Sequence, residues 1–322
     1  MTYDSLTAHF VHADLPQVGA FISSSDLLNN IQHATRFSSL SNLQQSPTDC
    51  PTREKNGYLG DGGMTAATVT YNFETAVFYT RWMRDVRDAL AYPAGLNVTC
   101  VANVVPISCR GPGTVAAGEQ CQKGVCASSD PSWTVGYPTT VELVRDIFED
   151  DRIVDRNYDD VKTWHDILAA QLTNLSSPQP YVLTKQPIGD WAPPRPAPER
   201  STNKDESTFM FVHGTNILAH WAESRGNLSD FAKFRRLIAT VKAHYQANFF
   251  DNSTGGYRDK TCTQESSGYM PLSQMLALRL GVVATTNRQA LFNFLLALVE
   301  GLQPGPSQQF PNHSAWCGSH CS

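Results

Sequence analysis

The sequence predicts an all-α fold, an incomplete (α/α)6 toroid, from three observations. Eight stretches carry apolar residues at helical spacing, and nowhere does a period-two alternation persist with the composition of strands. Short turns and long loops alternate between these stretches, as in helical hairpins arranged side by side. A closed barrel of six hairpins needs two helices for each hairpin. About eight helices would therefore cover roughly two-thirds of such a barrel.

Length and charge limit the classes of protein to consider. The chain has 322 residues and a net charge of -5, which allows one large domain or two ordinary ones. Its pI of about 6.0 gives no sign of a nucleic-acid partner or an anionic membrane surface. No apolar run reaches the length needed to span a bilayer, and the first residues lack the basic and apolar regions of a signal peptide.

The elements follow in order along the chain. Residues 1–22 have the pattern of an extended lead-in, and Ser25 then offers an N-cap to a helix that reaches about Leu43. A single long helix is predicted over about 65–90, with an apolar side formed by Phe73, Val77, Trp82, Met83 and Val86. Six more helical patterns lie at about 138–149, 158–173, 208–223, 230–248, 268–280 and 287–302. We expect residues 23–302 to form one partial toroid, with Trp82 and Trp164 in its core.

A cysteine-rich insertion at about 95–128 interrupts the helices. Its four cysteines fit two local disulfides better than zinc ligands, although unpaired or metal-binding thiols are the alternative: Cys100, Cys109, Cys121 and Cys126. Five Asn-x-Ser/Thr sequons accompany them, at Asn97, Asn174, Asn227, Asn252 and Asn312. Together these features favour a secreted or secretory-pathway glycoprotein, of which this chain would be an internal fragment.

The loop at 47–61 concentrates the candidate chemistry. Asp49, Glu54 and Asp61 lie there with Arg53 and Tyr58, and no hydrophobic periodicity runs through them. Inverting glycoside hydrolysis needs one protonated carboxyl and one ionised carboxyl, ~6.5–9.5 Å apart. The like charges of Asp49 and Asp61 favour the protonated form of Glu54, which makes Glu54 the candidate acid. The alternative is that these acids only solvate a loop and cap the next helix.

The other residues of this loop suit sugar binding. Asp49 and Asp61 can accept hydrogen bonds from sugar hydroxyls, because an ionised carboxylate is an acceptor only. Tyr58 can stack against the apolar face of a 6-deoxy sugar. We expect Arg53 to pair with a carboxylate other than Glu54 and to fix the loop.

The same loop resembles a known signature. The run Asp-Cys-Pro-x-Arg-Glu at 49–54, followed by Gly-aromatic at 57–58 and Gly-Asp at 60–61, is similar to the catalytic loop of family 78 glycoside hydrolases, the inverting α-L-rhamnosidases. The resemblance implies a six-hairpin glycosidase domain. It also implies that Asp49, Arg53, Glu54 and Asp61 line a rhamnose subsite, with Glu54 as proton donor. Most relatives have tryptophan where Tyr58 stands.

Two later segments match the family in order and spacing. Asp130-Pro131-Ser132-Trp133 resembles its Asp-Pro-x-Trp-Gly segment, with Thr134 in place of the glycine, and 189–191 resembles its Gly-Asp-Trp loop. The resemblance implies that Trp133, Asp190 and Trp191 contact the sugar, although a core role is the alternative for both tryptophans. The chemistry requires no cofactor and no metal.

Part of the family pattern is missing. The family's general base is a glutamate in a later Thr-x-Trp-Glu segment, and no such segment occurs here; Glu300 has different surroundings. Residues 303–322 have the composition of disorder or of an aberrant end. The β-sandwich domains that normally precede the barrel are also absent. Uncovered helix faces of an open toroid predict poor solubility.

The leading hypothesis is hydrolysis of terminal α-L-rhamnosyl residues from glycosides or polysaccharides, with the general base apparently absent. The alternative is a non-catalytic carbohydrate-binding or regulatory remnant of such an enzyme. A different helical-toroid enzyme would not account for the run at 49–54 as a unit. The expected partner is a rhamnose-containing glycoside or polysaccharide, without nucleic acid or membrane.

Overall fold

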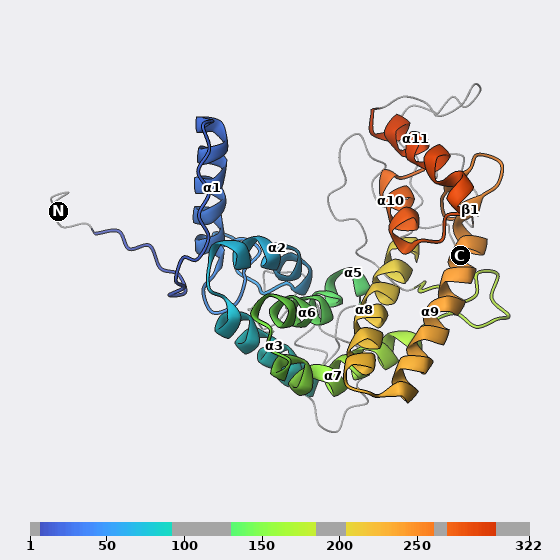
Figure 1. Ribbon diagram of the computed structural model, residues 1–322, viewed down its shortest axis with the longest axis horizontal. Coiled ribbons are helices and arrows are strands. Elements are labelled where there is room, and N and C mark those ends of the chain that lie inside the picture. The colour runs from blue at the N-terminus through green and yellow to red at the C-terminus, as the bar shows by residue number, and fades with distance from the viewer. Residues whose placement is uncertain (1–6, 92–129, 185–203, 261–268, 301–322) are drawn as a thin grey trace. The chain divides into compact units, whose positions relative to one another are not determined.

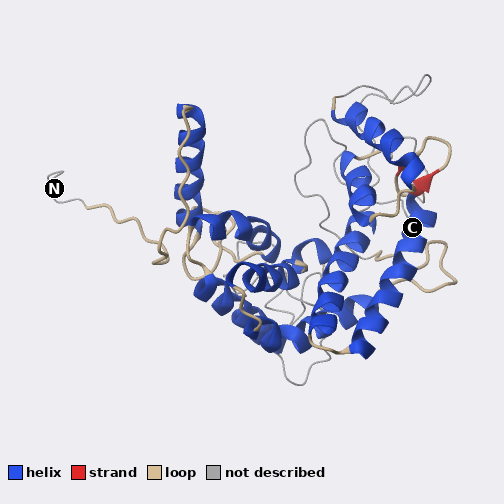
Figure 2. Cartoon of the chain, viewed as in Figure 1, coloured by secondary structure: helices blue, strands red, loops and turns tan. Residues whose placement is uncertain are grey.

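The computed structural model describes residues 7–91, 130–184, 204–260 and 269–300. Its helices are α1 (Asp26–Asn42), α2 (Leu59–Asn72), α3 (Ala76–Ala91), α5 (Pro131–Thr134), α6 (Gly136–Phe148), α7 (Arg152–Ala169), α8 (Lys204–Ser224), α9 (Leu228–Phe249), α10 (Pro271–Leu280) and α11 (Arg288–Val299), as Figure 1 shows. A short hairpin, β1 (Phe250–Asp251) with β2 (Gly256–Tyr257), and a 3-10 turn at Thr285–Asn287 complete the described elements. Helices dominate throughout, which confirms the predicted all-α class (Figure 2).

The chain divides into two compact units. The first contains residues 1–127 and 136–160, and the second contains residues 128–135 and 161–322. The chain passes from one unit to the other three times, the last time inside α7. Each unit has its own buried aromatic residues, so each is described separately below.

In the first unit, α6 packs closely on both α2 and α3. Gly63 and Gly136 allow this approach: a Cβ on Gly63 would lie 2.8 Å from the Gly136 Cα, and one on Gly136 would lie 2.1 Å from the Leu59 carbonyl oxygen. Trp82 packs onto Gly62 in the same way, and its side chain is buried as predicted. The start of α2, which carries the acidic loop, is therefore held against a rigid core.

The prediction of one long helix over 65–90 is wrong, because two helices, α2 and α3, cover this stretch. Phe73 is extended (φ -134°, ψ 151°) and ends α2. The Glu74 N–H donates to the Pro16 carbonyl at 2.8 Å, so the lead-in supplies the bond that a continuous helix would have made itself. Apolar spacing alone does not reveal such a break. Val77, predicted on the apolar side, is 83% exposed.

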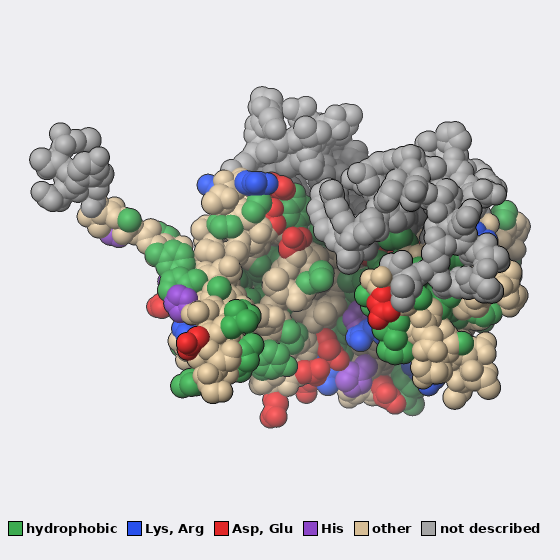
Figure 3. Space-filling model, turned by 90° about the horizontal axis from the view of Figure 1, so that it is seen from above, with side chains coloured by type: hydrophobic (Ala, Val, Ile, Leu, Met, Phe, Trp, Pro, Cys, Tyr) green, Lys and Arg blue, Asp and Glu red, His purple; other side chains and the backbone are tan. Residues whose placement is uncertain are grey.

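Helix α1 forms where it was predicted but has a different environment from the one expected. None of its residues is buried among the described part of the chain. Its large apolar side chains are exposed, namely Leu27, Leu28, Ile31 and Phe37. The extended N-terminal segment also carries hydrophobic side chains on the surface (Figure 3).

In the second unit, α8 and α9 form a hairpin around Trp221, Phe211 and Phe234, all fully buried, and Trp164 lies in the core as predicted. Asn227 caps α9: its Oδ1 accepts from the Asp230 N–H at 3.1 Å, and its Nδ2 donates to the Asp230 carboxylate at 2.9 Å. The amide nitrogen of this sequon is thus hydrogen-bonded within the fold.

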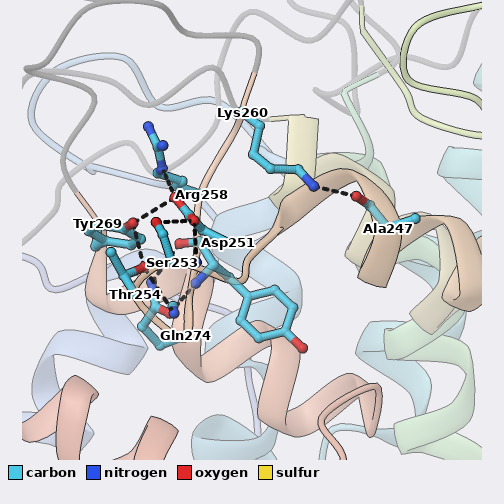
Figure 4. A network of polar contacts seen from close by, with 10 residues as sticks. Ala247, Asp251, Ser253, Thr254, Arg258, Lys260, Tyr269 and Gln274 are labelled. Atoms are coloured by element: carbon cyan, nitrogen blue, oxygen red, sulfur yellow. Dashed lines mark hydrogen bonds and ion pairs between the residues drawn. The ribbon is translucent and has the colours of Figure 1, made fainter.

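The β1–β2 hairpin, which the sequence analysis did not anticipate, is held by one carboxylate (Figure 4). Asp251 accepts hydrogen bonds from Ser253, from Arg258 Nε at 2.8 Å and from the Tyr269 hydroxyl at 2.9 Å. The backbone N–H of Tyr257 donates to Gln274 Oε1 at 2.7 Å, which ties the hairpin to α10. Two residues per strand are too few to produce a readable alternation.

Several predicted features lie outside the described residues. These are the whole of the cysteine-rich insertion at about 95–128, the segment with Asp190 and Trp191, and the tail at 303–322. Among the described helices, none combines the length and the hydropathy needed to cross a membrane.

Candidate active site

The acidic loop joins α1 to α2 and is closed by its own backbone. The Asp49 N–H donates to the Asn56 carbonyl at 3.0 Å, and the Asn56 N–H donates to Asp49 Oδ1 at 3.0 Å. Between them, the N–H groups of Arg53 and Lys55 both point to the Cys50 carbonyl, and Lys55 takes a positive φ of 58°. Asp49 is therefore partly a structural residue of the loop.

The Cys50 thiol links the two acids of the loop. Its Sγ donates to Asp49 Oδ2 at 2.9 Å and accepts from the Glu54 N–H at 3.3 Å. The thiol is free of any disulfide. These contacts fix the backbone at Glu54 relative to Asp49.

The side chain of Glu54 is exposed and is held from one side. The Tyr58 hydroxyl donates to Glu54 Oε2 at 2.6 Å, and Asn56 Nδ2 lies 3.4 Å from the same hydroxyl oxygen. Burial raises the pKa of Tyr58 to about 12, and the hydrogen bond to Glu54 adds to this effect. Tyr58 therefore stays protonated, and remains a donor, at any ordinary pH.

The two remaining loop residues, Asp61 and Arg53, are both exposed. Asp61 is exposed in the first turn of α2, where a carboxylate is favoured by the helix dipole. Arg53 is exposed and makes no ion pair with any described carboxylate, so the pairing that we expected for it is not seen.

Trp133 lies in the second unit, on the short helix α5, and is half-buried. Asp130 caps this helix by accepting from the Ser132 N–H at 2.9 Å. The hydroxyl of Thr134, which replaces the family glycine, accepts from Trp164 Nε1 at 2.9 Å. Through this bond, Thr134 satisfies the indole N–H of the buried Trp164.

Three groups of the loop have the chemistry of metal ligands. Ligand atoms of Asp49, Cys50 and Glu54 lie within 4.8 Å of one another. The Cys50 thiol is already bonded to Asp49 and to the Glu54 backbone. These hydrogen bonds account for the closeness of the cluster without an ion.

Sequence reasoning did not identify two residues that shape this site. Cys50 appeared only as part of the motif, and Asn56, which is buried, was given no role. The dipeptide Asn56-Gly57 is a common turn signal and could have pointed to the loop closure. No sequence signal distinguishes a thiol that hydrogen-bonds to two neighbouring residues from one that makes no such contact.

The loop between α1 and α2 thus presents an exposed carboxyl that accepts a hydrogen bond from a neighbouring tyrosine, within an all-α fold. Comparison with known families agrees. Residues 16–301 match the model described as the bacterial alpha-L-rhamnosidase 6 hairpin glycosidase domain. The chain belongs to this family.

Curated relatives carry the name alpha-L-rhamnosidase. One from Formosa agariphila is 27% identical over 285 residues, covering 86% of this chain and 27% of the relative. Another, from Streptomyces avermitilis, is 25% identical and covers 92% of this chain and 25% of its own length. The chain thus spans about a quarter of the length of these relatives.

Solved structures share the fold. The alpha-L-rhamnosidase from Dictyoglumus thermophilum superposes with a TM-score of 0.72 at 23% identity, covering 89% of this chain and 29% of that one. The Streptomyces avermitilis enzyme, solved with L-rhamnose, gives a TM-score of 0.67 at 21% identity over 90% of this chain and 24% of that one. These likenesses confirm the six-hairpin glycosidase-like fold.

Proposed function

We propose that this chain carries the acid half of an inverting α-L-rhamnosidase site, which acts on terminal α-L-rhamnosyl residues of glycosides or polysaccharides. Glu54 is the proposed proton donor to the leaving oxygen. The observation that supports this most is the placement of Glu54: its carboxyl is exposed to a ligand while its backbone and one oxygen are fixed by Cys50 and Tyr58.

In this proposal, Asp49, Arg53 and Asp61 form the polar wall of the rhamnose subsite. Carboxylates accept from sugar hydroxyls, and a guanidinium donates to sugar oxygens. Tyr58, Trp133, Asp190 and Trp191 are proposed to complete the contacts to the sugar. The Thr-x-Trp-Glu segment that carries the family's general base does not occur in this sequence, and we propose that the general base is missing from this chain.

The second candidate is a carbohydrate-binding or regulatory remnant without turnover. It is favoured by one observation, the absence of a Thr-x-Trp-Glu segment from the sequence. Such a protein would retain the subsite around Glu54 and bind rhamnose. It would not hydrolyse its glycosides.

Release of p-nitrophenol from p-nitrophenyl α-L-rhamnopyranoside tests the first candidate. Glu54→Gln is compared with Glu223→Gln, an exposed glutamate of α8. Turnover that is lost only in Glu54→Gln supports the enzyme. Rhamnose binding without turnover supports the remnant, and the absence of both refutes the two candidates together.

A further inference from the structure

The hydrogen bond between Tyr58 and Glu54 has a defined direction. The side-chain nitrogen of Asn56 can only donate, and it lies 3.4 Å from the Tyr58 hydroxyl oxygen. The hydroxyl carries one proton, which it donates to Glu54 Oε2 at 2.6 Å. Asn56, Tyr58 and Glu54 thus form a short chain of donors that ends on the carboxyl.

The tyrosine is the fixed partner of this pair. Its carbonyl accepts from the Gly62 N–H at 2.9 Å, so Tyr58 caps α2. The next residue, Leu59, is fully buried in the first unit. Glu54, in contrast, is exposed on the turn. The hydroxyl therefore sets where the carboxyl points, and an exposed glutamate gains one defined orientation.

We propose that Tyr58 is a positioning residue for Glu54, holding Oε2 so that Oε1 carries the proton that is transferred. This inference rests on the proposed function, in which Glu54 is the acid. It gives Tyr58 a role through its hydroxyl, in addition to the stacking of its ring on the sugar.

The position of the donor matters during the reaction. As the O–H bond at Glu54 Oε1 breaks, the proton bonds to the glycosidic oxygen, and the electron pair of the bond from C1 stays on that leaving oxygen. A water oxygen forms the new bond to C1 from the opposite face and gives up its proton to a base. Glu54 becomes a carboxylate, and a hydrogen bond to a charged acceptor is stronger than one to a neutral acceptor. The bond from Tyr58 therefore stabilises the charge as it develops.

Nuclear magnetic resonance with 13Cζ-labelled tyrosine tests the contact in the whole chain. The spectrum is followed between about pH 3.5 and pH 8, a range that spans ordinary glutamate titration. We expect the Tyr58 resonance to move as the Glu54 carboxyl takes up its proton. The movement should vanish in Glu54→Gln and persist in Asp49→Asn, which removes a neighbouring charge and keeps an oxygen for the Asn56 N–H. A Tyr58 resonance that does not move, or that still moves in Glu54→Gln, would overturn the proposal.

If the chain hydrolyses a rhamnoside, its kinetic constants distinguish a positioning role of the Tyr58 hydroxyl from a role in packing alone. Tyr58→Phe should lower kcat by about tenfold or more, since general acid catalysis contributes ~100-fold or more, and should change KM less. Tyr71→Phe is the matched control, an exposed tyrosine at the other end of α2. Equal kcat in Tyr58→Phe and wild type would contradict the proposal. Failure of the wild type to bind rhamnose would instead refute the proposed function. The pH series of the Tyr58 resonance would still test the contact between Tyr58 and Glu54.

Discussion

Asp49 and Asn56 bond to each other twice, once between their backbones and once from the Asn56 N–H to the Asp49 carboxylate, each at 3.0 Å. The pair closes the loop that presents Glu54. A residue expected to contact substrate is therefore also a structural support, and the two roles make different demands on its side chain.

Substitution of Asp49 separates these roles. Asp49→Asn keeps an oxygen for the Asn56 N–H, whereas Asp49→Ala leaves that buried donor without its acceptor. If loop closure dominates, Asp49→Ala should lower rhamnose affinity by about tenfold or more, about 1.4 kcal/mol, and Asp49→Asn should retain most of it. Isothermal titration calorimetry measures both. Equal losses in the two variants would show that the negative charge itself contacts the sugar.

Asp251 should make the second unit sensitive to acid. Burial opposes its charge, but hydrogen bonds from Ser253, Arg258 and Tyr269 hold the pKa of Asp251 well below its usual value. A lowered pKa in the folded state contributes stability above the unfolded value of about 3.9, and this contribution is lost as pH falls below it.

Asp251→Asn should lower the free energy of unfolding at neutral pH by about 2 kcal/mol, because an amide NH2 would face the donors on Arg258 and Tyr269. Urea denaturation at neutral and acid pH measures the difference, which should shrink on acidification. Glu223→Gln is the control, since Glu223 is exposed on α8 and should matter little. A penalty that stays constant with pH would contradict the assignment.

His165 should add a second pH dependence. It is fully buried against the rings of Phe211 and Phe234. Burial lowers the pKa of His165, although its contact with Asp166 opposes this. The folded state therefore favours neutral histidine, so the stability is complete above the unfolded value of about 6.5 and declines below it.

His165→Phe should remove this decline between about pH 7 and pH 5 and should cost less than about 1.5 kcal/mol at neutral pH, as a swap of similar volume. Thermal unfolding followed across that range measures it. The exposed His220 offers a matched substitution, His220→Gln, that should leave the decline unchanged. An identical pH dependence in His165→Phe and wild type would contradict this reading.

The exposed face of α1 should limit solubility. Leu27 and Ile31 are 69% and 53% exposed, and they lie one turn apart on the helix. Changing both to glutamine should raise the monomer fraction in size-exclusion chromatography, and each change should alter stability by less than about 0.5 kcal/mol. Met64→Gln, at an isolated exposed position on α2, should not change association. A large loss of stability would mean that the face is covered in solution.

The sequence predicted the elements that rest on long periodic patterns. Helix α1 and the buried Trp82 and Trp164 follow directly from apolar spacing. The break at Phe73 was not predictable, because it depends on a hydrogen bond from Glu74 to a residue far away in the chain. Tertiary contacts override local spacing at such points.

The candidate site divides in the same way. The clustering of Asp49, Glu54 and Asp61 in one loop was visible in the sequence, and the loop indeed joins two helices. The hydrogen bond from Tyr58 to Glu54 was not visible in the sequence. A tyrosine four residues after a glutamate predicts no contact unless the turn between them is known. Among the described residues, no carboxylate pairs with Arg53, whose side chain is exposed on the turn.

The proposed function requires that the loop at 49–61 binds rhamnose. A two-dimensional 1H–15N spectrum of the labelled chain, titrated with L-rhamnose and with L-fucose as the comparison sugar, detects such binding. We predict that the backbone resonances of Asn56, Gly57 and Gly60 shift with rhamnose and much less with fucose, and that Glu54→Gln alters the shifts. Loop resonances that do not move, or that respond equally to both sugars, would contradict the account.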